Sequence, residues 1–313
     1  MKAFIIGAAG FVGGHLMDEM LRLGWTVGAS KMPQETIAKV GVSVYDLDIL
    51  NPAAISAVLS AFAPDYIVHL AAQSSVALSW KNPGLTIDVN IKGAVNVLEA
   101  VRALEKKPRV LLIGSGEQYG HIHLDECPVG EQTPMRPGNI YAATKACQDM
   151  LGKIYADAYD LDVMMVRAFN HVGPAQNPMF VVASFCKQIA EIEAGLCQPV
   201  LQVGNLSAKR DFTDVRDVVR AYTMLLERGR SGEVYNVGSG KAIAISELLE
   251  KIVALSSAQI AVQVDPARLR PVDIPIIEAD ISRLHQDTGW KPSVPLEQTL
   301  GDTLCYWRKA VQQ

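Results

Sequence analysis

The sequence lacks the cysteine patterns that build disulfide frameworks or zinc sites. Its five cysteines are scattered, with no C-x-x-C pair and no histidine-rich cluster beside them (Cys127, Cys147, Cys186, Cys197 and Cys305). Such cysteines are typical of reduced thiols in a cytoplasmic protein. We therefore expect a cytoplasmic location and no metal site.

Basic tracts and long apolar runs are also missing. The net charge is −4, and no stretch resembles the basic surfaces that follow nucleic-acid phosphates. No run approaches the ~18 uninterrupted apolar residues of a membrane span. The N-terminal "MKAFIIGAAGFVGGHL" is broken by glycines, so we interpret it as a strand and turn rather than a signal peptide. We therefore expect neither a nucleic-acid partner nor a membrane partner.

Short apolar runs alternate with helical periodicity through the first half of the 313 residues. Continuous apolar runs predict parallel strands buried on both faces, at 2–7, 26–30, 42–47, 66–71, 109–115 and 162–169. Helices are predicted between them, at 11–23, 52–62 (capped by Asn51), 83–104 and 141–159. The alternation predicts an α/β fold with a doubly wound parallel sheet of the Rossmann type.

The alternation breaks after residue 173. A helix at about 179–195 leads to a short strand and a charged loop in "QPVLQVGNLSAKRDFTDV", and "RDVVRAYTMLLERG", "EVYNVGSG" and "AISELLEKIVALS" follow as helix, strand and helix. We expect a Rossmann domain from 1–173 and 213–238. A smaller α/β substrate-binding domain from 174–212 and 239–313 would lie over the carboxyl edge of the sheet.

A glycine turn, "GAAGFVG", directly follows the first predicted strand and opens a helix. Gly7, Gly10 and Gly13, with Phe11 and Val12 between them, let backbone amides approach a pyrophosphate at a helix N-terminus. The alternative is a tight turn without a ligand. The position between strand and helix favours a dinucleotide site.

The ends of the next strands carry further candidates for this cofactor. Ser30 and Lys31 stand where an NAD site usually has an acid, which favours a 2′-phosphate and NADPH, although Lys31 can also be a solvated loop residue. Asp48, beside Ile49, either accepts from an adenine amino group or caps the helix near Pro52. Small residues close the fourth strand, where backbone must pass near the cofactor, in the segment Leu70, Ala71 and Ala72.

"YAATKA" places Tyr141 and Lys145 four residues apart, and thus on one face of a predicted helix. A lysine one turn away should lower the pKa of a tyrosine that transfers a proton. Ser115 follows a strand and can hold a carbonyl oxygen while a hydride arrives. Glu117 can instead remove a proton and drive an elimination. A Tyr–Lys pair alone often only covers surface, but the glycine turn and Ser115 favour catalysis.

The order of the glycine turn, "HLAA", "GSGEQYG", "YAATK" and "RAFNHVGP" resembles the extended short-chain dehydrogenase/reductase family over essentially the whole chain. The resemblance implies a Ser115–Tyr141–Lys145 triad acting on a nucleotide-sugar, with Asn90 as a buried asparagine beside the site. It also implies that the backbone of His171 lines the nicotinamide pocket.

Three longer segments, "FNHVGPAQ", "VGNLSAKRDFTDVRDV" and "RLRPVDIP", resemble the GDP-6-deoxy-4-keto-D-mannose reductases, which make GDP-D-rhamnose. This resemblance implies that a GDP-sugar is held by residues from several segments (Ser115, Glu117, Asn170, Lys187, Arg210, Arg270 and Asp273). The alternatives are a GDP-mannose 4,6-dehydratase or another nucleotide-sugar epimerase, and a non-catalytic NADP sensor. The sensor would normally lack Tyr141 or Lys145, and both are present.

Two predicted helices carry apolar residues in more rows than one sheet face can cover (Val95, Leu98 and Val101 on 83–104; Cys147, Met150, Leu151 and Ile154 on 141–159). In relatives these helices form a two-fold four-helix interface, so the resemblance implies a homodimer.

Overall fold

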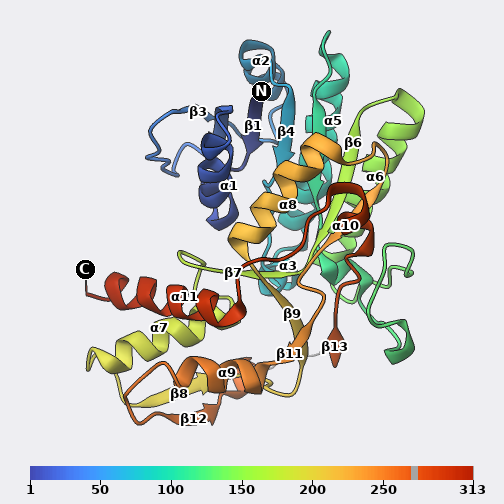
Figure 1. Cartoon of the computed structure of the whole chain (residues 1–313). Helices are drawn as coiled ribbons and strands as arrows, with labels where there is room; N and C mark the ends of the chain where they lie inside the picture. Colours follow the sequence, from blue (N-terminus) through green and yellow to red (C-terminus); the bar gives the residue numbers. More distant parts are fainter. Residues whose placement is uncertain (269–273, 313) are drawn as a thin grey trace.

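The computed structural model describes residues 1–268 and 274–312. Seven of its strands form one parallel sheet in the order β10-β6-β5-β4-β1-β2-β3, which confirms the predicted Rossmann-type α/β fold (Figure 1). These strands are β1 (Lys2–Ile6), β2 (Thr26–Lys31), β3 (Val42–Asp46), β4 (Tyr66–His69), β5 (Arg109–Ile113), β6 (Val163–Ala168) and β10 (Val234–Val237). The order reverses between β1 and β4, so their carboxyl ends open a crevice of the kind that binds ligands in such sheets.

The expectation of burial on both faces is wrong for β3. β3 lies at the edge of the sheet, and its residues are exposed or half-buried. Since an edge strand has one neighbour, here β2, its side chains are not covered as those of central strands are.

Helices cover both faces of this sheet. One face packs against α1 (Phe11–Arg22) and α8 (Val215–Arg228), and the other packs against α2 (Pro52–Phe62), α5 (Gly93–Ala103) and α6 (Ile140–Tyr159). Asn51 caps α2 as predicted, since its side chain accepts from Ala54 N at 3.1 Å. Apolar side chains on alternate strand positions therefore enter two separate cores.

The predicted helix at 83–104 is broken into three parts. α4 (Pro83–Ile87) and α5 are joined by a π-helical turn, Asp88–Lys92, and a short helix, α3 (Val76–Lys81), precedes them. π turns inside helices are frequent at functional sites. The break carries Asn90, which is fully buried.

The second part of the chain forms two small sheets with helices beside them, in the lower part of Figure 1. β9 (Lys209–Asp214) pairs with β7 (Asn170–Val172), β11 (Ala242–Ala244) and β13 (Ile276–Ile277), and β8 (Val200–Val203) pairs with β12 (Ala261–Val264). The helices here are α7 (Val181–Glu193), α9 (Ile245–Val253) and α11 (Leu296–Ala310). The expected charged loop at 209–214 is thus a strand, in which Arg210, Asp211 and Asp214 are buried with hydrogen-bond partners.

The predicted division into two domains stays a prediction, but contacts of α10 bear on where the boundary between them lies. α10 (Ser282–Thr288) packs against α8 and β10, and Leu284 and Trp290 are buried in the core beneath α1. A segment assigned to the smaller domain therefore contributes to the larger one.

Two further observations concern the described residues alone. No helix among them is long and apolar enough to cross a membrane. The five cysteines are all free thiols, and a cytoplasmic location stays a prediction.

Candidate active site

Ser115 lies two residues beyond β5, at the carboxyl edge of the sheet. Its hydroxyl accepts from Glu117 N at 3.2 Å and its own amide donates to Gln118 Oε1 at 2.7 Å, which caps a 3₁₀ turn, Gly116–Tyr119. Gly116 lies so close to Phe169 that a Cβ would meet the ring at 3.2 Å. The hydroxyl is therefore held in a fixed place above the strand.

Tyr141 is the second residue of α6, in the turn capped by Asn139, whose side chain accepts from Ala142 N at 2.8 Å. The Tyr141 side chain is buried and hydrogen-bonded to Ser115. Burial raises its pKa to about 12; the bond to Ser115 opposes this and the charge of Glu117 adds to it. The phenol therefore keeps its proton at neutral pH, as a proton donor must.

Lys145 is on the same helix, and its side chain is only 3 % exposed. Its ammonium donates to the carbonyl of Ile113 at 2.6 Å and to Gln148 Oε1 at 3.1 Å. Burial lowers its pKa to about 8, opposed by the charge of Asp149. The expected lowering of the Tyr141 pKa by Lys145 is not seen, because this ammonium is bonded at the end of β5 instead.

Asn90 connects the π turn to the start of α6. Its side chain accepts from Gln73 N at 2.8 Å and donates to Gln73 O at 3.1 Å and to Thr144 Oγ1 at 2.9 Å. Thr144 in turn donates to Tyr141 O at 2.7 Å. The buried asparagine thus fixes the helix turn that carries Tyr141.

The glycine turn follows β1 and has the features of an anion site. Gly7 has φ +81°, and a Cβ there would meet Ala71 Cα at 2.6 Å, while a Cβ on Gly13 would meet Ala8 O at 2.2 Å. A Cβ on Gly10 would meet nothing within 4 Å, and Gly10 gives α1 no side-chain cap. Since the first amides of a helix have no partner inside it, they fit a pyrophosphate.

Other predicted cofactor residues lie around this turn. The His171 ring stacks on Phe11 with centroids 6.3 Å apart, and its Nδ1 lies 3.1 Å from Phe169 O. Loss of solvent lowers the pKa of His171 to about 4, so the ring is neutral. The amides of Leu70 and Ala71 both donate to Ile6 O at 2.9 Å. The other predicted neighbours, Val12 and Ala72, are half-buried.

Ser30 and Lys31 both have protein partners. The buried Ser30 hydroxyl accepts from Gly7 N at 3.0 Å, so it holds the glycine turn. The Lys31 ammonium pairs with Asp46 at 2.5 Å. Binding of a 2′-phosphate by either residue stays a prediction, and Lys31 would have to share its charge with Asp46.

Asp48 is exposed, and its carboxylate accepts from Leu50 N at 2.9 Å. The alternative that it caps α2 is wrong, because Asn51 does so. Ile49 is buried against Gly93, and its carbonyl accepts from Asn96 Nδ2 at 2.9 Å. A role for these two residues at an adenine stays a prediction.

The predicted substrate residues are spread over the second part. Asn170 is exposed on β7, Lys187 on α7 pairs with Glu191, and Arg210 on β9 is buried. Arg210 donates to Lys209 O at 2.8 Å and to Ile274 O at 2.6 Å, so these carbonyls already bind part of its guanidinium. Arg270 and Asp273 lie outside the described residues.

Glu117 is half-buried between the serine and the helix. Its carboxylate accepts from Asn139 Nδ2 at 3.3 Å, and its charge acts on Tyr141. The structure therefore brings together Ser115, Glu117, Tyr141 and Lys145 at the end of β5.

Two buried polar residues of this region were not singled out from the sequence. Gln148 contacts Lys145, and its spacing of three residues on a helix was the available signal. His69, at the end of β4, is fully buried, its two ring nitrogens have no hydrogen-bond partner among the described residues, and burial lowers its pKa to about 3. Nothing in its spacing distinguished it from other strand residues.

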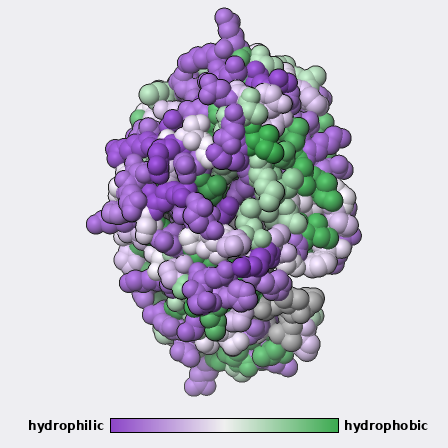
Figure 2. All heavy atoms as spheres, turned by 90° about the vertical axis from the view of Figure 1, so that its right-hand side faces the viewer, coloured by the Kyte–Doolittle hydropathy of each residue, from purple (hydrophilic) through white to green (hydrophobic). Residues whose placement is uncertain are grey.

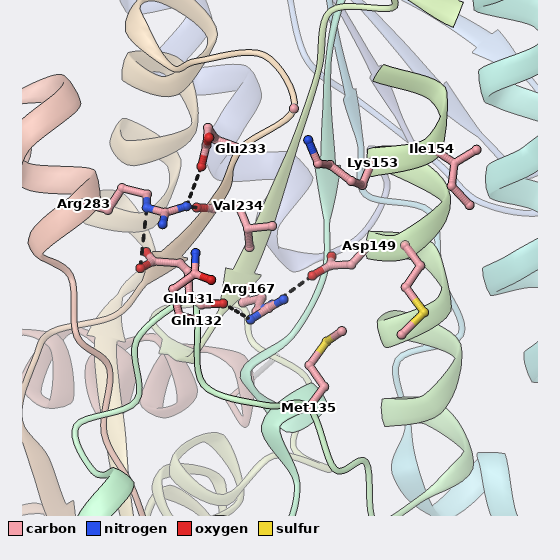
Figure 3. A pocket seen from close by; sticks show the side chains of 12 residues that line it. Glu131, Gln132, Met135, Asp149, Lys153, Ile154, Arg167, Glu233, Val234 and Arg283 are labelled. Carbon is pink, nitrogen blue, oxygen red and sulfur yellow. Dashed lines mark hydrogen bonds and ion pairs between the residues drawn. The ribbon is translucent and has the colours of Figure 1, made fainter. Parts of the chain in front are cut away.

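A cavity of about 620 Å³ lies beside α6, away from these residues (Figure 3). Lys153 and Ile154 of α6 lie on one side and Glu131 and Arg283 on the other. Neither Ser115, Tyr141 nor Lys145 lines it. The chemistry predicted from the sequence therefore belongs to the crevice at the strand ends, and not to this cavity.

A Rossmann sheet with a serine after β5 and a Tyr-x-x-x-Lys pair on the next helix defines an oxidoreductase of the short-chain dehydrogenase/reductase class. A family model described as GDP-mannose 4,6 dehydratase matches residues 4–303. The chain belongs to this family, within the NAD-dependent epimerase/dehydratase group.

Individual relatives have several activities. The chain is 33 % identical over 312 residues to a GDP-6-deoxy-D-mannose reductase of Pseudomonas aeruginosa, covering 100 % of this chain and 99 % of the relative. It is 26 % identical to a GDP-mannose 4,6-dehydratase of Vibrio cholerae, covering 100 % and 95 %.

Solved structures show the same range. The structure of RMD from Pseudomonas aeruginosa, complexed with NADPH, matches with TM-score 0.87 and 32 % identity over 99 % of both chains. The UDP-glucose 4-epimerase of Thermus thermophilus, in complex with NAD, matches with TM-score 0.89 and 28 % identity over 99 % of this chain and 100 % of its own.

Proposed function

We propose that the chain is an NADPH-dependent nucleotide-sugar 4-ketoreductase that reduces the C4 carbonyl of GDP-4-keto-6-deoxy-D-mannose to GDP-D-rhamnose. The observation that carries the proposal is a buried Tyr141 that is hydrogen-bonded to Ser115 and protonated at neutral pH. The full-length similarity to a GDP-6-deoxy-D-mannose reductase supports the choice of substrate.

The cofactor, when bound at the glycine turn, supplies the hydride. The residues of this chain orient the carbonyl and supply the proton. Ser115 holds the carbonyl oxygen, and Tyr141 gives its proton to that oxygen as negative charge develops there. Lys145 remains charged below about pH 8, and we propose that its ammonium stabilises the resulting phenolate once the cofactor is bound.

The alternative is a GDP-mannose 4,6-dehydratase, whose first step must remove a proton from the C4 hydroxyl. In that step Tyr141 would act as a base rather than as an acid. In the resembled dehydratases an arginine-rich "SPRRG" follows the "FNH" motif and an Asp or Ser commonly follows the triad hydroxyl, whereas this chain has "VGPAQ" at 172–176 and Gly116. Both differences favour reduction.

The proposal is tested by incubating the protein with NADPH and GDP-4-keto-6-deoxymannose. We expect the loss of NADPH absorbance to follow the loss of the 4-keto sugar one for one. With GDP-mannose and no added cofactor, we expect no 4-keto product. Formation of that product would favour the dehydratase and overturn the proposal.

Glu117→Gln distinguishes the two activities a second time. In a reductase, Glu117 binds a sugar hydroxyl and moves no proton, so the change should cost about 1–2 kcal/mol, roughly five- to thirtyfold in kcat/KM. In a dehydratase it would remove the general base and cost ~10²–10⁴-fold. The rates of both reactions should be measured with the same variant, and a loss in the larger range would identify the glutamate as a base.

Cofactor choice is tested at Lys31. We expect NADPH to support turnover at least as well as NADH, and Lys31→Asp to shift the preference toward NADH by placing an acid near the ribose. Asp46→Asn is the matched control, because it frees the ammonium from its present partner. An unchanged ratio of kcat/KM values in Lys31→Asp would mean that Lys31 does not contact the 2′-phosphate.

We further propose a homodimer through the outer faces of α4, α5 and α6. Figure 2 shows apolar side chains gathered on the upper part of the face that lies at the right in Figure 1, where α6 lies. Met150 and Ile154 are more than half exposed, and Leu85 and Ile87 are also exposed. Of the predicted interface residues, Leu98 and Val101 instead lie in the core, because they face α2 and the sheet.

Sedimentation at micromolar concentration should therefore show a dimer. Ile154→Glu should give a monomer, since it places a charge in the proposed contact. Leu196→Glu, at an exposed leucine outside this face, should leave the dimer intact. A stable wild-type monomer would refute the assembly.

A further inference from the structure

Gln148 closes a ring of hydrogen bonds around the Lys145 ammonium. Lys145 Nζ donates to Ile113 O at 2.6 Å and to Gln148 Oε1 at 3.1 Å, and Gln148 Nε2 donates to the same Ile113 O at 3.2 Å. Gln148 is fully buried. Both polar ends of its carboxamide therefore have partners, and each partner belongs to the candidate active site.

The carboxylate of Asp149, whose charge acts on Lys145, is bonded in another direction. Asp149 follows Gln148 on α6, and its Oδ2 accepts from Arg167 Nε at 2.8 Å. Figure 3 shows the Asp149 side chain turned toward Arg167, beside the cavity described above. Among the described residues of α6, no carboxylate is hydrogen-bonded to the ammonium, and the acceptors that hold it, Ile113 O and Gln148 Oε1, are both neutral.

We propose that Gln148 is a positioning residue for Lys145, holding the ammonium at the end of β5 through a neutral acceptor so that its charge is not cancelled. A carboxylate at this place would form an ion pair with the ammonium, and an apolar side chain would leave only one of its two bonds. The inference rests on the proposed role of Tyr141 and Lys145 in reduction.

Few titratable groups surround the Lys145 ammonium, so a shift in its pKa can be followed in a pH profile. The titratable and charged groups around it and its partner are Tyr141 and Asp149 on α6, His69 on β4, Glu117 after β5, and Arg167 on β6. His69, with a pKa of about 3, stays neutral from about pH 6 upward. A change of charge at residue 148 should therefore act mainly on Lys145.

The test is the pH profile of kcat/KM for reduction, from about pH 6 to about pH 10. In the wild-type protein we expect the alkaline limb near the Lys145 pKa of about 8. Gln148→Glu should move this limb upward by about one pH unit, because the new carboxylate stabilises the ammonium. Gln148→Met, similar in length, should move it downward, because an acceptor is lost.

Opposite shifts in the two variants support the inference. A loss of activity at all pH values with an unmoved limb would mean that Gln148 only packs, and would overturn it. Gln132→Glu makes the same chemical change on an exposed loop and should leave the profile unchanged. Thermal unfolding of each variant identifies any that fails to fold.

The two proposals fail in different ways. If Tyr141→Phe retains reduction, the proposed function is wrong whatever Gln148 does. If Tyr141→Phe is inactive and the Gln148 variants keep the wild-type profile, the positioning role alone is wrong.

Discussion

Tyr141→Phe should abolish reduction while leaving the affinity for NADPH nearly intact. The change removes one hydroxyl, the proton donor, and keeps a ring of the same shape in a buried position. Loss of a general acid typically costs ~10²–10⁴-fold. The rate of NADPH oxidation with the 4-keto sugar and the Kd for NADPH measure the two effects separately.

Two matched variants make this result specific. Lys145→Met should reduce both the rate and the affinity for NADPH, because in the resembled family the lysine also touches the nicotinamide ribose. Tyr159→Phe, at the far end of the same helix, removes a half-exposed hydroxyl and should change neither. Retained activity in Tyr141→Phe would show that another group donates the proton.

The pH dependence of this step follows from the two buried groups. The Tyr141 phenol, with a pKa of about 12, is protonated throughout the working range. Lys145 loses its proton near pH 8, so reduction should be full below that value and fall as pH rises through it. Cofactor binding changes the surroundings of both groups, so the measured limb reports the complex when kcat is used and the free enzyme when kcat/KM is used.

The sequence predicted the parts of the site that depend on element order. Ser115 follows a central strand, Tyr141 opens the next long helix, and the glycine turn follows β1. The carboxyl ends of parallel strands meet at one edge, so these three segments had to converge. Helical spacing placed Lys145 on the face of Tyr141.

The directions of long side chains could not be predicted in this way. Lys145 has the expected helix face, yet its ammonium is bonded to Ile113 O, because a buried charge takes the nearest strong acceptor. Ser30 stands at the expected strand end, yet its hydroxyl holds Gly7 N. Spacing gives the position of a Cα atom, and the partners of the side chain follow from tertiary contacts.

Helix irregularity was likewise invisible. Residues 83–104 have continuous helical periodicity, but the π turn at Asp88–Lys92 adds a residue and turns Asn90 inward. Its amide then bonds Gln73 and Thr144 across two segments. Such a break is stabilised by contacts far apart in sequence, and no local residue signals it.

Breaking the buried ion pair between Asp149 and Arg167, beside the candidate active site, should lower stability more than any other change considered above. Asp149 and Arg167 are 3 % and 6 % exposed in their side chains and 2.8 Å apart, and they join α6 to β6. Arg167 also donates to Glu131 O at 3.1 Å and lies over the Tyr119 ring, 4.9 Å from its centroid. Burial raises the pKa of Asp149, and the guanidinium opposes this. Each charge is therefore tolerated because the other is present.

Asp149→Leu should lower the free energy of unfolding by about 3–5 kcal/mol, because it leaves a buried guanidinium without its partner. Arg167→Met should lower it by a similar amount, because it leaves the buried carboxylate of Asp149 without its partner. The double variant should cost clearly less than the sum, since no buried charge remains unpaired. Urea unfolding of the four proteins measures this cycle, and additive costs would mean that the two charges do not stabilise each other.

The exposed pair Lys153–Asp157 on the same helix, 2.8 Å apart, provides the control. Its removal should leave the urea midpoint unchanged, because solvent screens both charges.

Asp149→Leu should also move the alkaline limb of the pH profile of reduction downward, since the charge of Asp149 is what opposes the lowering of the Lys145 pKa by burial. If Asp149→Leu lowers stability but leaves the alkaline limb unmoved, Asp149 pairs with Arg167 and does not raise the Lys145 pKa. Gln148 would then be the residue of α6 that positions the Lys145 ammonium.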